Sequence, residues 1–374
     1  MKVINSDLLK QFDTFMTSLK SSDKIAIYHD SDPDGTCAGV IAAKATEALT
    51  GKKVALHTGA NKNHRFVSEE LANEFKKEKI NKLIIVDIAA EEKPEGLLIV
   101  SKFADILIID HHKVYHDLKD EKQITLIKPQ LIWDMPEPSK YCTSKLVYDL
   151  MLRQVKQDSL DWVSVVGLIG DVCTSIWPEF MQAVFTKYNI ELKKDLFETK
   201  LGLIARIISS AEVYSDKNIN LCFNALYKAK NPDDIINSEL VKFKDIIEGE
   251  IKYFIDNAQA LAEFQKDIEL VFYLVEPKHA IKSPLCTILG FKYPNQTVIV
   301  VTKENENYCV SARRQDKKVA VNNLLEECTK GFNNSNAGGH AVSAGATFPV
   351  RYFDEFKSRL VANLKKHRLE NRKI

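Results

Sequence analysis

Three carboxylates stand within five residues of one another near the start of the chain. The segment HDSDPDG follows the apolar run KIAIY and contains Asp30, Asp32 and Asp34. Carboxylates this close repel one another, and a bound cation would offset that repulsion. Asp, Pro and Gly are also typical of a solvated turn in which Asp32 or Asp34 caps the next helix. This segment alone supports a cation site and a capping turn about equally.

Two later apolar runs also end on an acid. KLIIVD ends on Asp87, and ADILIID ends on Asp110, which His111 and His112 follow directly. A further acid, Asp171, follows the apolar stretch SVVGLIG. Parallel strands that end in this way gather their terminal side chains at one edge of a sheet. A single terminal Asp is often only a cap, whereas this whole group of acids and histidines favours one shared site.

The types of donor narrow the choice of metal. Carboxylates mixed with imidazole, without thiolate, suit Mn²⁺, Fe²⁺ or Zn²⁺ better than Ca²⁺, and a carboxylate can bridge two ions. Two ions about 3.5–4 Å apart activate a water and stabilise the leaving oxygen in phosphoester cleavage. These residues therefore predict a metal-dependent phosphoesterase.

Alternating strand and helix patterns must position these residues. From residue 24 to about 131, short apolar runs alternate with amphipathic stretches such as CAGVIAAKATEALT, which predicts a parallel sheet. Helical patterns alone fill roughly 178–264. The strand patterns IELVFYLV, QTVIVVTK and NYCVSARR follow, then a helix, a glycine-bearing loop and a terminal helix. We expect an α/β fold in three parts: a parallel-sheet α/β/α catalytic domain (1–180), a helical connector (181–266) and a smaller α/β domain (267–374).

Bulk properties describe an ordinary globular chain. Its 374 residues are enough for two domains, and 52 Lys and Arg against 51 Asp and Glu give a formal charge of +1. No chain-wide field attracts nucleic acid, so a polyanion must be bound locally. The seven cysteines are scattered and form no C-x-x-C pair, which argues against a disulfide framework or a structural zinc site. With no signal pattern and no membrane-length apolar run, we expect a cytoplasmic protein.

Four segments resemble the motifs of one family. HDSDPDG, VDIAA, IDHHK and GLIGD closely resemble the four motifs of the DHH phosphoesterase superfamily, in the manner of RecJ-like exonucleases and oligoribonucleases. SARR and NAGGHAVSAG resemble its associated C-terminal substrate-binding domain, whose hallmark is a glycine-rich stretch ending in Gly-Gly-His. Together these segments span nearly the whole chain, and their order makes the resemblance specific.

The resemblance implies roles for the acids and histidines of the first domain. It implies two divalent ions, Mn²⁺ first, with Mg²⁺, Fe²⁺ or Zn²⁺ as alternatives. The implied ligands are Asp30 and Asp32 for one ion, Asp34, His111 and Asp171 for the other, and Asp87 as a bridge between them. His112 would face the scissile phosphate, and Asp110 would orient a neighbouring histidine. Some family members have a histidine at the start of the first motif, so His29 beside Asp30 is also a candidate ligand.

The resemblance also assigns residues of the second domain. Arg313 and His340 would contact the phosphate, and Gly338 and Gly339 would let the backbone approach it closely. Ala337 replaces a further glycine that is usual in the family. Without the resemblance, Arg313 and its neighbour would be interpreted as a surface pair, and Gly338 to His340 as a turn. The active cleft would lie between the domains.

These implications lead to three functional hypotheses. The first is a Mn²⁺-dependent exonuclease or oligonucleotidase that acts on single-stranded RNA or DNA from an end. The second is a phosphatase or phosphodiesterase for a small nucleotide, such as a 3′,5′-bisphosphate nucleotide or a cyclic dinucleotide. The third is a catalytically silent scaffold of the replication machinery, which the complete set of motif residues disfavours. Expected partners are single-stranded nucleic acid or short oligonucleotides, with a homodimer or a replication or repair protein as further candidates.

Overall fold

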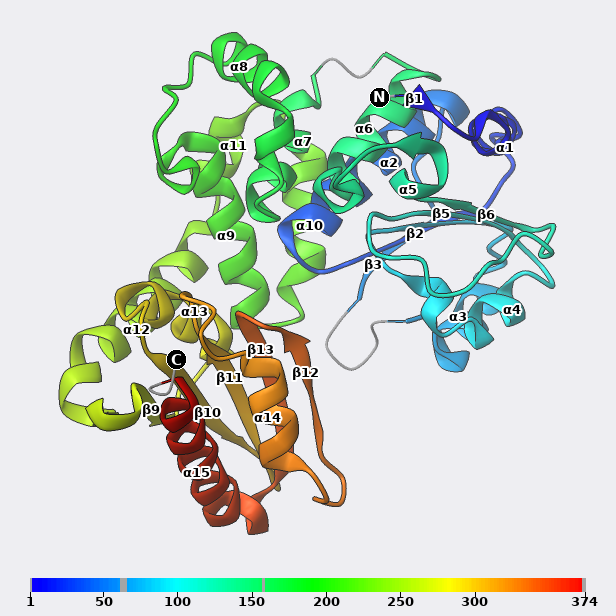
Figure 1. The fold of residues 1–374 in the computed structure, drawn as a ribbon. Coiled ribbons are helices and arrows are strands. Elements are labelled where there is room, and N and C mark those ends of the chain that lie inside the picture. Colours follow the sequence, from blue (N-terminus) through cyan, green and yellow to red (C-terminus); the bar gives the residue numbers. More distant parts are fainter. Residues whose placement is uncertain (1, 61–65, 157–158, 372–374) are drawn as a thin grey trace. The chain divides into compact units, whose positions relative to one another are not determined.

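The chain divides into two compact units, residues 1–244 and 245–374. The computed structural model describes residues 2–60, 66–156 and 159–371 (Figure 1). The predicted helical connector, residues 181–266, spans the boundary between the two units. Each unit has its own sheet and its own hydrophobic core.

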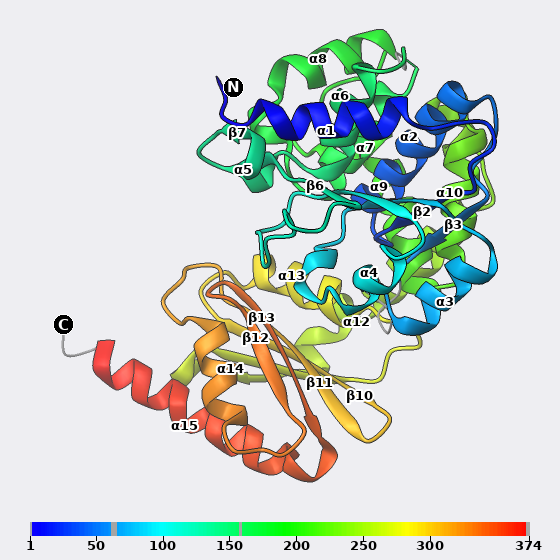
Figure 2. The same cartoon turned by 90° about the vertical axis from the view of Figure 1, so that its right-hand side faces the viewer.

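The first unit is built on a parallel sheet of five strands. The strands are Ile25–His29 (β2), Leu56–Gly59 (β3), Lys82–Val86 (β4), Asp105–Ile109 (β5) and Ile124–Ile127 (β6). They lie in the order β3-β2-β4-β5-β6, and every pair is parallel. Figure 2 labels β3, β2 and β6 of this sheet. Each strand overlaps one of the predicted apolar runs, which confirms the parallel α/β sheet.

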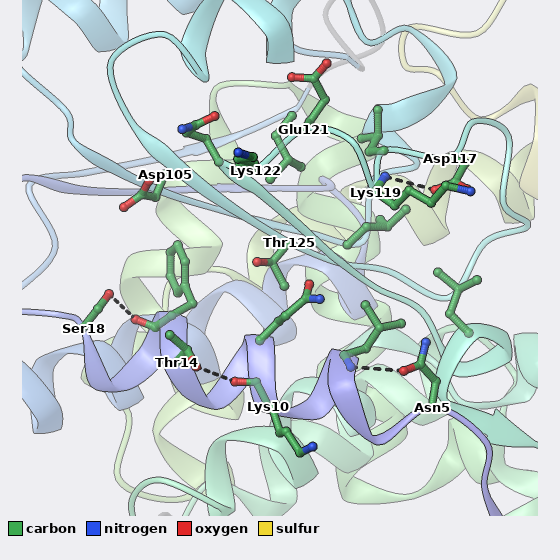
Figure 3. A pocket seen from close by; sticks show the side chains of 18 of the residues that line it. Asn5, Lys10, Thr14, Ser18, Asp105, Asp117, Lys119, Glu121, Lys122 and Thr125 are labelled. Carbon is green, nitrogen blue, oxygen red and sulfur yellow. Dashed lines mark hydrogen bonds and ion pairs between the residues drawn. The ribbon is translucent and has the colours of Figure 1, made fainter.

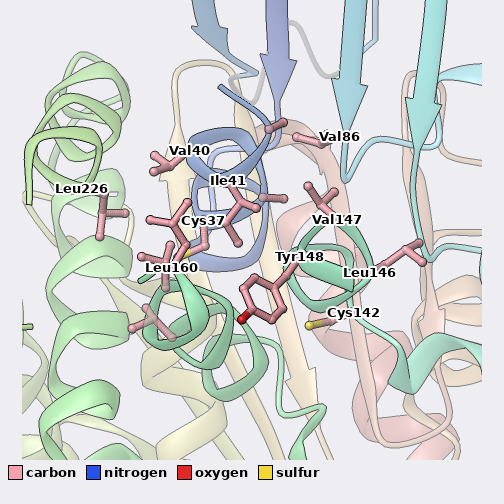
Figure 4. Close-up of a cluster of buried hydrophobic side chains, with 14 of the residues drawn as sticks. Cys37, Val40, Ile41, Val86, Cys142, Leu146, Val147, Tyr148, Leu160 and Leu226 are labelled. Carbon is pink, nitrogen blue, oxygen red and sulfur yellow. The ribbon is translucent and has the colours of Figure 1, made fainter. Parts of the chain in front are cut away.

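Helices cover both faces of this sheet. One face carries Ser6–Thr17 (α1), Pro33–Thr50 (α2), Thr143–Leu152 (α6) and Asp161–Gly170 (α7), and the other carries Glu69–Lys77 (α3) and Glu95–Val100 (α4). Strand side chains alternate between the two layers, so that Ile25 and Ile27 join the first cluster while Ala26 and Tyr28 join the second. The first cluster includes Val40 and Ile41 of α2 and Val147 of α6 (Figure 4). This three-layer packing fixes the strand ends that carry the acids.

Further helices complete the first unit and lead into the second. They are Pro129–Ile132 (α5), Pro178–Lys187 (α8), Lys200–Tyr214 (α9), Asn218–Lys228 (α10), Pro232–Ile236 (α11) and Val241–Leu261 (α12). Near the N-terminus, Lys2–Val3 (β1) pairs with Trp133–Asp134 (β7). The segment KNPDD contains the start of α11, where Asn231 caps the helix and its side chain accepts from Asp233 N–H.

The second unit contains a mixed sheet of six strands. They are Glu263–Gln265 (β8), Leu270–Val275 (β9), Thr297–Glu304 (β10), Asn307–Arg313 (β11), Asn336–His340 (β12) and Ser343–Pro349 (β13), in the order β12-β13-β11-β10-β9-β8. Val321–Thr329 (α14) and Phe353–Asn371 (α15) pack on one face, and Lys282–Lys292 (α13) packs on the other. The predicted glycine-bearing loop is wrong for residues 336–340, which form β12 because β13 pairs with them along their whole length.

Two further features of the described residues bear on the expectations above. No helix among them is both long enough and apolar enough to cross a membrane. The seven cysteines are all free thiols, and all are buried.

Candidate metal centre

Three of the predicted site acids lie in one row at the carboxyl edge of the parallel sheet. Asp30, Asp87 and Asp110 each follow the last residue of a strand, on the adjacent strands β2, β4 and β5. Their backbone N–H groups continue the ladder by one step. Asp30 donates to the Val86 carbonyl at 3.3 Å, and Asp87 donates to the Ile109 carbonyl at 3.0 Å. The acids therefore converge because the strands that carry them are neighbours.

His111 lies close both to Asp87 of this row and to Asp171, which follows helix α7. His111 Nε2 lies 3.5 Å from Asp87 Oδ1 and 3.7 Å from Asp171 Oδ2. Its Nδ1 lies 2.8 Å from the Ser139 carbonyl oxygen. A carbonyl can only accept, so Nδ1 carries the proton and the lone pair of Nε2 points between two carboxylates. Histidines that bind metals are commonly held in this way, with the second nitrogen donating to a carbonyl.

Repulsion among the carboxylates is the second sign of a cation site. Burial, and then the charges of Asp30 and Asp34, raise the pKa of Asp32 well above its usual range. Burial and the charges of Asp34, Asp32 and Asp30 do the same to the pKa of Asp87. The pKa of Asp171 is also raised, by burial and by Asp34. A divalent ion would remove this unfavourable energy, and the mixture of carboxylate and imidazole donors fits Mn²⁺, Mg²⁺, Fe²⁺ or Zn²⁺.

Asp34 is fixed by the start of a distant helix. Its Oδ2 accepts from Thr143 N–H at 2.7 Å and its Oδ1 from Ser144 N–H at 2.9 Å. These are free N–H groups of the first turn of α6, where a negative charge is favourable. Thr143 Oγ1 also donates to Asp87 Oδ1 at 2.8 Å. Thr143 was not predicted, because a Thr-Ser pair at a helix start indicates only local capping.

Gly167 of the GLIGD motif makes room for Asp34. A Cβ added to Gly167 would lie 2.7 Å from Asp34 Oδ1. Each Asp34 oxygen accepts one hydrogen bond and keeps a second lone pair, so the carboxylate can still bind a metal. The same Cβ would lie 2.1 Å from Ser144 Oγ, so the glycine is explained by the close approach of Ser144 and of the Asp34 carboxylate rather than by an unusual backbone angle.

A buried charge network lies behind the second histidine of the DHH run. His112 Nδ1 lies 2.6 Å from Asp110 Oδ1, which is the predicted orienting contact. Lys128 Nζ, itself fully buried, lies 2.7 Å from Asp110 Oδ2 and 2.6 Å from Glu91 Oε1. Burial alone would raise the pKa of Asp110, but the hydrogen bond from His112 and the charges of His112 and Lys128 bring that pKa below its usual range. Glu91 and Lys128 were not predicted, because nothing in their local sequence marks them.

Asp30 and His29, the alternative ligands at the first motif, have different surroundings. His29 is fully buried, its Nδ1 lies 2.7 Å from the Asp30 carbonyl oxygen, and its ring stacks on Phe223 with centroids 5.2 Å apart. Burial lowers the pKa of His29 to about 4. The Asp30 carboxylate accepts from the neighbouring Ser31, at 2.7 Å from the backbone N–H. Asp32 also caps α2, with its Oδ1 accepting from Gly35 N–H at 2.9 Å.

The second unit brings its predicted residues into one row. Across β11, β13 and β12, Arg313 lies opposite Ser343, and Ser343 lies opposite His340. Gly339 has φ of 131°, and a Cβ on it would lie 2.6 Å from the Ser343 carbonyl oxygen. A Cβ on Gly338 would have nothing within 4 Å, so the space beside this glycine is open. Ser343 joins the predicted pair through strand register alone, which the sequence does not reveal.

Arg314 does not fit the interpretation as a surface pair. It is fully buried, and its guanidinium lies 2.6 Å from both Asp316 Oδ1 and Glu269 Oε2. Its neighbour Arg313 donates instead to Thr287 Oγ1 at 3.1 Å and to Ser283 Oγ at 3.2 Å, on α13. The two arginines therefore have separate roles, and only Arg313 shares a row with His340.

A large hollow of the first unit lies away from these residues. Its volume is about 920 Å³, and it lies between α1 and the segment 114–126 (Figure 3). No predicted site residue lines it. Lys119 and Asp117 on its wall pair with each other at 2.8 Å. The hollow is therefore separate from the candidate metal centre.

Models of two protein families match this chain. The model of the DHH family, N-terminal domain, matches residues 24–167, and the model of the DHHA1 domain matches residues 279–366. A search of curated proteins finds no match. Exonuclease RecJ bound to manganese matches with a TM-score of 0.68 and 16% identity, over 95% of this chain and 94% of that chain.

Two other solved structures extend the comparison. RecJ from Thermus thermophilus in complex with Mn²⁺ matches with a TM-score of 0.65 and 15% identity, over 96% of this chain. This chain spans 55% of the length of that protein. A pGpG-specific phosphodiesterase from Vibrio cholerae matches with a TM-score of 0.50 and 13% identity, over 92% of this chain and 100% of that chain. At these identities the likeness is one of fold.

Proposed function

The chain belongs to the DHH phosphoesterase superfamily and carries a C-terminal DHHA1 domain, and from this premise we propose that it is a divalent-metal phosphodiesterase. Its substrate is single-stranded RNA or DNA, which it hydrolyses from an end, with Mn²⁺ as the working ion. The observation that carries this proposal is the convergence of three predicted metal ligands. Asp87 and Asp171 each place a carboxylate oxygen within 3.7 Å of His111 Nε2.

Two ions would be held by six side chains of the first unit. The ligands are Asp30 and Asp32 for one ion, Asp34, His111 and Asp171 for the other, and Asp87 for both. When bound, such ions supply an activated water and stabilise charge on the reacting phosphate. The hydrogen bonds of Thr143 and Ser139 hold these ligands in place before substrate arrives, which limits reorganisation during the reaction.

His112 is the proton donor of this proposal. Cleavage forms a bond between the water oxygen and phosphorus, with loss of a proton from that water to solvent, and breaks the bond from phosphorus to the ester oxygen of the leaving nucleotide. That oxygen takes a proton from the protonated His112. Asp110 favours this protonated state through its contact with His112 Nδ1 at 2.6 Å. In the second unit, the row of Arg313 and His340 supplies cationic and hydrogen-bonding groups for a terminal phosphate.

Hydrolysis of labelled oligomers tests the proposal. Purified protein with Mn²⁺ is mixed with 5′- and 3′-labelled RNA and DNA of graded length, and the products are resolved at single-nucleotide steps. A ladder that shortens from one end is expected. Asp87→Asn and His111→Ala should each lower the rate by several orders of magnitude, because each removes a ligand. Unreduced activity in both variants would overturn the proposal.

A small-nucleotide phosphodiesterase is the second candidate. Two observations favour it: the formal charge of +1 lacks the basic excess of proteins that track long nucleic acid, and the fold matches a pGpG-specific phosphodiesterase along the whole of that chain. The same length series separates the two candidates. A value of kcat/KM that is highest on dinucleotides and falls steeply with length supports the small-nucleotide enzyme.

A further inference from the structure

Helix α7 ends in a backbone motif that usually takes glycine. The N–H groups of Val172 and Cys173 donate to carbonyls three and five residues earlier, at 3.1 Å and 2.9 Å, which is the Schellman pattern. Val172 has φ of 52°, where a β-branched side chain is strained. Among the described residues, α3 and α8 end in the same pattern with Lys79 and Asn189, and Val172 is the only β-branched residue with positive φ.

Core packing does not account for this valine. Its side chain is 62% exposed, so little apolar surface is buried in return for the strained backbone. Glycine at this position would relieve the strain and lose almost no packing within the chain. A valine here makes physical sense if its side chain contacts something outside the chain.

Val172 forms one wall of a preformed hollow. The hollow has a volume of about 590 Å³, within the range of about 300–1,000 Å³ that small ligands occupy. Its apolar walls are Ile169, Val172, Leu196 and Phe197. Phe197 N–H donates to the Asp195 carboxylate at 2.9 Å, which fixes the short helical turn that carries the ring. The binding surface thus exists before any ligand arrives.

This hollow begins beside a predicted metal ligand. Asp171 lies between Ile169 and Val172 in the chain, and its carboxylate points toward His111 Nε2, 3.7 Å away. A group that fills the hollow therefore lies beside the chain segment that carries this predicted metal ligand. Charged side chains also line the hollow, with Lys194 as the cation and Glu198 as an acid.

We propose that this hollow holds a nucleobase of the substrate. The proposal rests on the proposed function, because it takes the substrate to be a nucleotide. A base has two apolar faces and a polar edge, so one face packs on Phe197 and Val172 while its edge meets the charged groups of Lys194 and Glu198. An aliphatic ligand would fill the apolar walls but would leave these charges unused. Val172 is then a residue that determines specificity.

Substrates that lack one base test the proposal directly. The value of kcat/KM is measured on a natural dinucleotide and on matched dinucleotides with an abasic sugar at the first or second position. Wild-type protein should prefer the natural dinucleotide over one abasic partner by about tenfold or more, since stacking on an aromatic ring contributes that much. Phe197→Ala and Val172→Gly should abolish this preference. The melting temperature of the Val172→Gly protein should also be no lower than that of wild type.

A binding measurement gives a readout without hydrolysis. A dinucleotide that carries the fluorescent base 2-aminopurine is titrated with protein in EDTA, and stacking on Phe197 should quench its emission. Leu192→Ala is the matched control, because Leu192 is 53% exposed and lies outside the hollow. This variant should quench 2-aminopurine emission as wild type does, and it should show the same preference for the natural over the abasic dinucleotide. Equal rates on natural and abasic dinucleotides, or quenching that survives both hollow variants, would overturn the inference. Absence of hydrolysis on every substrate would instead overturn the proposed function beneath it.

Discussion

Single residues outside the predicted ligand set hold the ligands in place. Thr143 is the clearest case, since its hydroxyl donates to Asp87 at 2.8 Å and its N–H donates to Asp34 at 2.7 Å. One residue therefore orients carboxylates from two different elements. Groups that orient metal ligands usually affect metal affinity nearly as much as the ligands do.

Replacing the Thr143 hydroxyl should weaken metal binding. Thr143→Val keeps the shape and the N–H but removes this hydroxyl donor from Asp87, and we expect Mn²⁺ affinity to fall roughly 10–100-fold. Calorimetric titration of metal-free protein measures this affinity. Thr143→Ser retains the hydroxyl and is the matched control, with affinity close to wild type. Identical affinities for the Val variant and wild type would show that the hydroxyl has no orienting role.

Lys128 is the residue whose loss should cost most stability. Its ammonium lies between the buried carboxylates of Glu91 and Asp110, so Lys128→Met removes the cation from Glu91 and leaves Asp110 with His112 alone. We expect the free energy of unfolding in urea to fall by roughly 3–5 kcal/mol. The control is Lys119→Met, which breaks an exposed pair with Asp117 and should leave the urea midpoint unchanged. Equal midpoints for the two variants would contradict this prediction.

At the scale of elements, Arg314 joins β11 to the start of β9. Its guanidinium binds Asp316 just after β11 and Glu269 just before β9. Burial would raise the pKa of Asp316, but the hydrogen bond and charge of Arg314 bring that pKa below its usual value. A carboxyl with a lowered folded-state pKa contributes stability above its unfolded-state pKa, and that stability is lost as pH falls through the folded-state pKa.

The Asp316 pair should therefore stabilise the protein only above acidic pH. We expect Asp316→Asn to lower the free energy of unfolding at pH 7 by about 1–3 kcal/mol. The difference from wild type should shrink as pH falls below about 3.9, the usual Asp value, and should vanish once Asp316 is protonated in both states. Urea unfolding across pH 2–7 measures it. A difference that does not change with pH would mean that the contact is not ionic.

The strands of the parallel sheet were predictable, but their partners in the site were not. Runs such as KLIIVD predict a buried strand with an acid at its end. Neighbouring strands then place those acids close together. The contact from Thr143 to Asp87 spans 56 residues, and no local pattern encodes such a pairing. Strand β12 was missed for the opposite reason. Its Ala-Gly-Gly core has low strand propensity, and the ladder with β13 overrides it.

At the scale of the whole molecule, the candidate metal centre belongs to one unit only. All six predicted ligands lie in residues 1–244. A ligand that binds the folded state stabilises the part that binds it, by about 2.7 kcal/mol at a hundredfold excess over its Kd. The second unit provides none of these ligands.

Manganese should therefore protect one unit. We expect Mn²⁺ to slow backbone hydrogen exchange in peptides from residues 1–244, most strongly at the ends of β2, β4 and β5, and EDTA to reverse the effect. Mass spectrometry of peptic fragments measures it. In Asp87→Asn the protection should be lost while exchange in residues 245–374 stays as in wild type. Protection that persists in this variant would place the ion elsewhere.

The seven buried thiols can report which part of the chain unfolds, because unfolding exposes them to a labelling reagent. Burial raises the pKa of Cys222, Cys286 and Cys328 to about 12. A maleimide should therefore not react with these thiols in the folded protein. Four cysteines lie in residues 1–244, namely Cys37, Cys142, Cys173 and Cys222, and three lie in residues 245–374, namely Cys286, Cys309 and Cys328. A brief pulse of reagent thus adds four labels when only the first unit opens, three when only the second opens, and seven when both do. The mass of the labelled intact chain then shows which of the two units unfolded first.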